Sequence, residues 1–221
     1  MFRKKINEER EIALQSFYNL EDRLTEKLGV NLVTVGFTAS TDDTNKSLHI
    51  FNMAKHLAED GERVLIVDAD LRDPKLASIT GKNKDRGFID LILGDYSIDD
   101  LIMHDENYDD LSYIFTGQVA DYADKFLEPD AVKAFYNDVR DRFDYVFIDL
   151  SPNTDIPEAN MFAGLADSAV VFSKLDKSNS TVTRDSLKQL EKSNANILGI
   201  IITDYLYQED ELDELFGGDN E

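Results

Sequence analysis

The sequence predicts an α/β fold, with one mainly parallel sheet and helices on both of its faces. Short runs of continuously apolar, β-branched residues recur along the 221-residue chain, and segments with apolar residues at helical spacing separate them. Strands of a parallel sheet are buried on both faces and need helical crossovers, which matches both features. Because the sequence has no repeat and no Pro- or Ser-rich linker, we expect a single domain.

The elements follow in order along the chain. Residues 3–28 carry an apolar stripe at helical spacing, made of Ile6, Ala13, Phe17, Leu20, Leu24 and Leu28. This stripe predicts a helix that packs on its own domain or also meets a partner. Strands are predicted at 31–37, 63–70, 110–117, 144–152, 166–175 and 196–204. Helices are predicted at 46–60, at 88–103 as two short helices around Gly94, at 130–143 and at 177–193.

The charge balance excludes several classes of partner. The chain has 45 acidic residues against 23 lysines and arginines, a net charge of −22. Nucleic acids and anionic membranes attract basic surfaces, so neither is expected as a direct partner. Seven of the acids lie in the last 14 residues, which predicts a solvated tail at 206–221 after a domain at 1–205.

Other compositional features narrow the chemistry and the location. The chain contains no cysteine, so thiolate catalysis, disulfides and Cys-ligated zinc are excluded. No apolar run reaches ~18 residues, so we expect no insertion into a membrane. The charged N-terminus MFRKKINEERE precedes no apolar core of a secretory signal. These features predict a cytoplasmic protein.

A phosphate-binding motif follows the first predicted strand. Lys46 and Ser47 open a helix, as the lysine and hydroxyl residue of a P-loop do, where the lysine reaches phosphates and the hydroxyl binds Mg²⁺. Asn45 occupies the position of the usual glycine, and asparagine tolerates the left-handed conformation required there. Asp42 and Asp43 would repel a triphosphate. We predict that one of these two carboxylates takes the place of a phosphate and pairs with Lys46.

Acidic residues end two other strands. Asp68 and Asp70 follow the second strand, and Arg72 comes directly after them. Asp149 ends the 144–152 strand, as the Walker B carboxylate that holds Mg²⁺ does. Each acid alone is explained by a turn that it closes. Because the carboxyl ends of parallel strands meet at one edge, the set predicts a P-loop NTPase-like nucleotide site.

The same residues resemble a known family. VLIVDADLRDPK (64–75) is similar to the VLLIDADLRKP signature of the bacterial tyrosine kinases of capsule and exopolysaccharide synthesis. FDYVFIDLSP (143–152) resembles their FDYVIIDTPP, and GFTASTDDTNKS (36–47) lies where their TSSxPGEGKS lies. AGLADSAVVFSK (163–174) and ILGIIITD (197–204) also resemble family segments. The order and spacing agree over residues ~10–205.

The resemblance implies phosphoryl transfer from Mg²⁺–ATP to tyrosine. Its implied catalytic residues are Lys46, Asp68 and Asp70, one acid activating the tyrosine hydroxyl and the other helping the metal. Its implied metal ligands are Ser47, Asp68 and Asp149. Its implied nucleotide contacts are Ser40, Asn45, Lys46, Ser47, Arg72 and Thr203, with Arg72 near the phosphates or holding its loop. The family's partner is a membrane-anchored chain-length (co-polymerase) protein, which would recruit the kinase to the inner face of the membrane. The family also forms homo-oligomers.

The sequence departs from the family in four places. Asp42, Asp43, Thr44 and Asn45 replace Pro-Gly-Glu-Gly of the phosphate loop. No tyrosine cluster ends the chain, whose last tyrosines are Tyr205 and Tyr207. The helical Glu-x-x-Arg-x-x-Arg assembly motif aligns with Ile12, Gln15 and Tyr18. Thr203 replaces the asparagine that reads adenine.

Three functions therefore stay open. The first is an ATP-dependent tyrosine kinase, supported by the retained Lys46, Ser47 and acids. The second is a non-catalytic pseudokinase that regulates polysaccharide assembly through protein contacts, supported by the altered loop and the missing tyrosines. The third is a partition or division ATPase of the same fold, which the acidic charge disfavours because a DNA-binding version needs basic residues.

Overall fold

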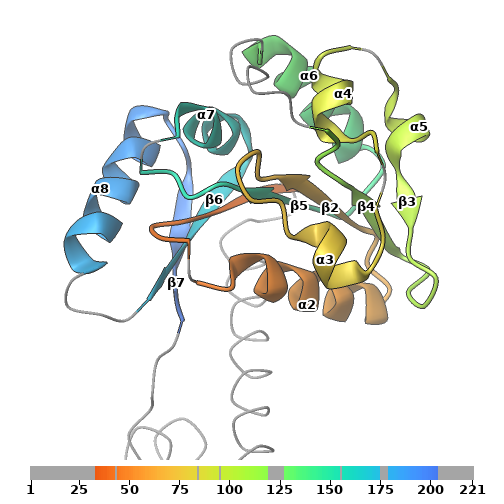
Figure 1. Ribbon diagram of the computed structural model, residues 1–221, viewed down its shortest axis with the longest axis horizontal. Coiled ribbons are helices and arrows are strands. Elements are labelled where there is room, and N and C mark those ends of the chain that lie inside the picture. The colour runs from red at the N-terminus through yellow and green to blue at the C-terminus, as the bar shows by residue number, and fades with distance from the viewer. Residues whose placement is uncertain are drawn as a thin grey trace, which may run out of the picture.

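A seven-stranded sheet with helices on both faces forms the centre of the molecule (Figure 1). The computed structural model describes residues 33–42, 44–83, 85–94, 96–118, 127–154, 156–174 and 179–203. The strand order is β3-β4-β2-β5-β1-β6-β7, and every neighbouring pair is parallel except β3 with β4. The predicted α/β fold with a mainly parallel sheet is confirmed. The helix predicted at 3–28 and the tail at 206–221 lie outside the described residues.

The elements match the sequence pattern with three additions. The strands are β1 (Thr34–Ala39), β2 (Val64–Ala69), β3 (Met103–His104), β4 (Leu111–Ile114), β5 (Tyr145–Leu150), β6 (Ser168–Lys174) and β7 (Ile197–Thr203). The helices are α2 (Lys46–Glu59), α3 (Leu76–Thr80), α4 (Phe88–Ile92), α5 (Ile98–Leu101), α6 (Pro129–Arg140), α7 (Pro157–Leu165) and α8 (Asn179–Lys192). The sequence did not predict β3, α3 or α7. Two of these, β3 and α3, are too short to show a clear period.

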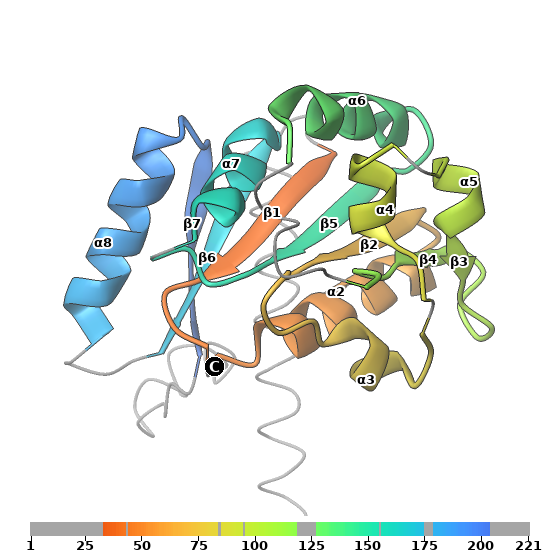
Figure 2. The same ribbon diagram turned by 45° about the horizontal axis from the view of Figure 1, so that its top comes forward.

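Two apolar cores lie on the two faces of the sheet. Figures 1 and 2 show α2 and α3 on one face and α4, α6, α7 and α8 on the other. On the α2 face, Phe37 of β1 packs edge-on against Phe147 of β5, with ring centroids 5.1 Å apart. On the opposite face, Phe88 of α4 contacts Phe135 of α6 and Phe162 of α7. Burial on both faces explains the continuously apolar strands.

The three strands that carry the predicted site are neighbours in the centre of the sheet. β5 lies between β2 and β1, and Asp149 is the register partner of both Asp68 on β2 and Phe37 on β1. The loops after these strands therefore meet at one edge. The described helices include none with the length and apolar character needed to cross a membrane.

Candidate active site

The phosphate-loop turn forms without glycine. Asn45 adopts a left-handed conformation, with φ 53° and ψ 26°, and α2 begins at the next residue, Lys46. The Asn45 carbonyl accepts the N–H groups of Leu48 at 3.1 Å and His49 at 3.2 Å. The asparagine thus takes the backbone conformation that the sequence pattern required of it. The N-terminus of α2, with its positive end of the helix dipole, faces the pocket described below.

Lys46 lies buried beneath the first turn of α2, with 6% of its surface exposed. Its ammonium pairs with the carboxylate of Asp149 at the end of β5. Burial lowers the pKa of Lys46 to about 8, although the charges of Asp70 and Asp68 act in the opposite direction. An ammonium in this position is suited to hold an anion, because little water competes for it.

The predicted pairing of Lys46 with a loop carboxylate is wrong for Asp42. Asp42 is exposed to solvent and forms no ion pair with Lys46, while Asp43 lies outside the described residues. The parallel pairing of β1 with β5 explains the difference, since it places the Asp149 carboxylate directly below α2. A buried carboxylate also attracts the lysine more strongly than one in water.

Asp68 is held by the backbone of the loop that follows β2. Its two carboxylate oxygens accept the N–H groups of Asp70 at 3.2 Å and Leu76 at 3.0 Å. Burial raises the pKa of Asp68 to about 6, because these hydrogen bonds and the charge of Lys46 only partly offset the loss of water. Asp68 therefore closes a turn, which is the structural role that the sequence left open for each acid. It also lies near enough to the buried ammonium of Lys46 for the two charges to interact.

Asp70 connects two of the loops. One carboxylate oxygen accepts the N–H groups of Arg72 and Asp73, both at 3.1 Å. The same oxygen accepts the hydroxyl of Ser151, in the loop after β5, at 2.6 Å. Asp70 also lines the pocket, whereas Asp68 lies behind it. Of the two acids, Asp70 is thus the one placed to meet a bound molecule.

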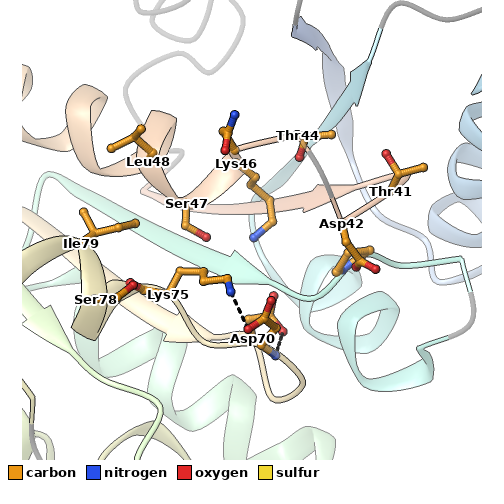
Figure 3. A pocket seen from close by; sticks show the side chains of 13 residues that line it. Thr41, Asp42, Thr44, Lys46, Ser47, Leu48, Asp70, Lys75, Ser78 and Ile79 are labelled. Atoms are coloured by element: carbon orange, nitrogen blue, oxygen red, sulfur yellow. Dashed lines mark hydrogen bonds and ion pairs between the residues drawn. The ribbon is translucent and has the colours of Figure 1, made fainter.

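A pocket of about 270 Å³ opens between the N-terminus of α2, the loop after β2 and α3 (Figure 3). The predicted residues Asn45, Lys46, Ser47 and Asp70 line one part of it. The opposite wall is formed by Lys75, Ser78 and Ile79, which the sequence interpretation missed because α3 was not predicted. The one available signal was that Lys75 is the last residue of the signature segment 64–75.

Charges around the pocket are mixed. Its lining carries the carboxylates of Asp42, Asp70 and Asp73 and the ammonium groups of Lys46 and Lys75. The Lys75 ammonium lies 2.6 Å from a carboxylate oxygen of Asp73, which offsets much of its charge. A triphosphate alone would therefore bind weakly, and a divalent cation that offsets the carboxylates would strengthen its binding.

The residues predicted to hold Mg²⁺ lie on three elements. Ser47 of α2 lines the pocket, whereas Asp68 of β2 and Asp149 of β5 do not line it and are register partners at the ends of adjacent strands. In the described part of the chain, no three His, Cys, Asp or Glu side chains form a metal site by themselves. Mg²⁺ at nucleotide sites is usually held by one or two carboxylates together with phosphate oxygens and water. The donors present match that arrangement.

Three predicted nucleotide contacts do not line the pocket. Ser40 is buried at the end of β1, where its N–H donates to Phe172 at 2.9 Å. Arg72 pairs with Glu158 of α7 at 2.9 Å, which fits the loop-holding role left open for it. Thr203 is buried at the end of β7, and its hydroxyl has no partner among the described residues. Their roles as nucleotide contacts stay predictions.

Comparison with known proteins connects this geometry to a family. The family model described as AAA domain matches residues 43–198. EpsB of Ralstonia nicotianae is 30% identical over 173 residues, covering 78% of this chain and 23% of EpsB. The succinoglycan biosynthesis transport protein ExoP of Rhizobium meliloti is 27% identical over 171 residues, covering 76% of this chain and 22% of ExoP.

A solved structure agrees with these relatives. The kinase domain of the Escherichia coli tyrosine kinase ETK superposes with a TM-score of 0.78 at 20% identity, covering 88% of this chain and 79% of that domain. The chain spans about a quarter of the length of the curated relatives EpsB and ExoP. Together these findings confirm the resemblance to bacterial tyrosine kinases drawn from the sequence motifs.

Proposed function

This chain belongs to the AAA domain family, and we propose that its pocket binds Mg²⁺–ATP for phosphoryl transfer to a tyrosine hydroxyl. The observation that carries the proposal is the buried Lys46 beside the left-handed Asn45, at the N-terminus of a helix that opens onto the pocket. A buried ammonium and a helix N-terminus are the groups that bind phosphates in P-loop proteins.

We assign each residue of the site a separate role in this reaction. Lys46 would hold the phosphate oxygens, and Ser47, Asp68 and Asp149 would hold Mg²⁺, which would offset the negative charge of the phosphates. Asp70 lines the pocket, so we assign it as the base that accepts the proton of the attacking tyrosine hydroxyl. The tyrosine oxygen then bonds to the γ-phosphorus, the bond from that phosphorus to the bridging oxygen breaks, and ADP leaves.

Titration calorimetry tests nucleotide binding first. Wild-type protein is titrated with ATP and ADP in excess Mg²⁺, beside Lys46→Ala and the control Lys75→Ala. We expect micromolar binding, about −8 kcal/mol, that Lys46→Ala abolishes and Lys75→Ala changes only a few-fold. No heat up to millimolar nucleotide would contradict the proposal.

A specific observation favours a second function, that of a non-catalytic pseudokinase. Lys46 is already paired with Asp149, and three carboxylates line the pocket against two ammonium groups. These features weaken phosphate binding. Transfer of labelled phosphate from ATP to a synthetic tyrosine peptide separates the two functions: transfer that Asp70→Asn abolishes supports the kinase, and binding without transfer supports the pseudokinase.

The pathway and partner follow from the family resemblance. We propose that the protein acts in the cytoplasm on capsule or exopolysaccharide assembly, recruited to the membrane by a chain-length adaptor protein. The relative ExoP is named a succinoglycan biosynthesis transport protein, which supports this pathway. Co-sedimentation with vesicles that carry the cytoplasmic segment of such an adaptor tests recruitment, with bare vesicles as the control. Light scattering tests whether the chain forms a homo-oligomer.

A further inference from the structure

A fully buried asparagine lies just after β5, the strand that carries the predicted Mg²⁺ ligand Asp149. Asn153 lies four residues after Asp149 and has none of its surface exposed. Its side-chain amide donates to Asn160 Oδ1 of α7 at 2.9 Å and to the carbonyl of Ser186 in α8 at 3.0 Å. Its amide oxygen accepts the Ser186 hydroxyl. Only an amide side chain supplies two donors and an acceptor here without a charge.

The backbone around Asn153 reaches the strands that carry the pocket. The N–H of Asn153 donates to the carbonyl of Ala39, the last residue of β1, at 3.2 Å. Two residues earlier, the carbonyl of Ser151 accepts the Thr38 hydroxyl at 2.7 Å, and the Ser151 hydroxyl donates to Asp70 at 2.6 Å. One short loop thus connects the ends of β1 and β2 to the end of β5.

The helix α8 supports both sides of the site. The Ser186 hydroxyl donates to the Asn153 side chain. Thr183, one turn earlier on α8, has its hydroxyl 2.7 Å from the Ser173 hydroxyl, and it donates to the Ser40 hydroxyl at 3.3 Å. Ser40 opens the phosphate loop. The same helix therefore contacts the start of the phosphate loop and, through Asn153, the loop that follows Asp149.

We propose that Asn153 is a positioning residue for the metal side of the pocket, acting through the loop of Ser151 that directly follows β5, the strand that carries Asp149. The inference deepens the proposed function and depends on it. Without the Asn153 amide, two acceptors and one hydroxyl lose their buried partner, and the loop is no longer fixed to α7 and α8. Because Asp149 lies two residues before Ser151, in the strand that leads into this loop, we expect the loss to fall on the cation-dependent part of nucleotide binding.

The test compares ATP affinity in Mg²⁺ with ATP affinity in EDTA. It uses wild type, Asn153→Ala and the matched control Asn196→Ala, whose exposed amide donates to Asp167 at the far edge of the sheet. We expect Asn153→Ala to lose about tenfold or more of the affinity gained from Mg²⁺, with binding in EDTA unchanged within about twofold. Equal losses in both conditions would show a merely structural role and overturn the inference.

Amide hydrogen exchange tests the role of Asn153 independently of nucleotide binding. If wild type binds no nucleotide, the proposed function fails, and exchange then decides the inference. Asn153→Ala should raise exchange in peptides covering both 36–47 and 148–152, while a change confined to α7 and α8 would overturn it. Should Asn153→Ala fail to fold, Ser186→Ala removes one hydroxyl donor only and should give the same pattern at smaller size.

Discussion

The carboxylates at the two edges of the central sheet have opposite pKa shifts. At the amino edge, Asp167 accepts the N–H groups of Val33 and Thr34 and pairs with Arg140 at 2.6 Å. These partners lower its pKa below the usual value, even though burial acts to raise it. At the carboxyl edge, burial raises the pKa of Asp68 to about 6, because its hydrogen bonds and the charge of the nearby Lys46 only partly offset the loss of water.

The difference is between a carboxylate that stabilises the fold and one that we propose serves the site. Asp167 has enough partners to be most stable as an anion, so it favours the folded state at neutral pH. Asp68 forms no ion pair of this kind among the described residues, and in the proposed function a divalent cation would supply the missing positive charge. A carboxylate that folding leaves without enough partners lowers stability, as groups at functional sites often do.

Removal of the amino-edge acid should give the largest loss of stability. Asp167→Ala leaves two backbone N–H groups, the Thr34 hydroxyl and Arg140 without their acceptor. We expect the free energy of unfolding to fall by about 2–4 kcal/mol in urea denaturation, with ATP affinity unchanged. Arg63→Ala, which breaks an exposed pair with Asp144 at the same edge, should lower the free energy of unfolding far less, because water screens that pair. Similar losses in both variants would contradict the contrast.

The pH dependence of stability should carry the signature of Asp68. A group whose pKa is raised on folding binds its proton more tightly in the folded state. Its contribution to stability is complete below about pH 4 and is lost as the pH rises to about 6, by up to about 3 kcal/mol. Urea denaturation of wild type and Asp68→Asn between pH 3.5 and 7 measures it. The decline should be missing from the variant, and an unchanged profile would show that Asp68 is not the titrating group.

Substitutions at the phosphate-loop turn should have a smaller effect. At φ 53°, Asn45→Val forces a β-branched residue into the left-handed region, which should cost about 1–2 kcal/mol and remove nucleotide binding. Asn45→Gly should keep the turn, change stability by less than about 1 kcal/mol and leave ATP affinity equal to wild type or higher. Thermal denaturation and calorimetry measure both. Weaker binding by Asn45→Gly would show that the asparagine side chain itself contacts the ligand.

The arginine after the two acids should matter least. Arg72 is half exposed and paired with Glu158, so Arg72→Gln should lower the free energy of unfolding by about 1 kcal/mol or less. If it only holds its loop, the ATP affinity of Arg72→Gln stays within about twofold of wild type. A loss of tenfold or more would instead place the arginine on the phosphates. Glu158→Gln, which breaks the same pair from the other side, is the matched control.

Much of the fold could be predicted because its rules are local. Apolar runs such as 64–67 and 145–148 can be buried only as central strands, and both are. The two short helices around Gly94 were predicted from the same kind of pattern and are confirmed. The two-residue β3 and the five-residue α3 were missed because such short segments carry no readable period.

The candidate site, like the fold, could be predicted only in part from local patterns. The sequence by itself determined that Lys46, Ser47, Asp68, Asp70 and Asp149 meet at one edge of the sheet, because residues that end parallel strands must do so. It also determined that Asn45 could form the turn. Only the tertiary structure decided which acid holds Lys46, that α3 supplies a wall of the pocket, and that Asn153 connects the loops to α8. These choices depend on strand register and on contacts between residues far apart in the chain, which no local pattern records.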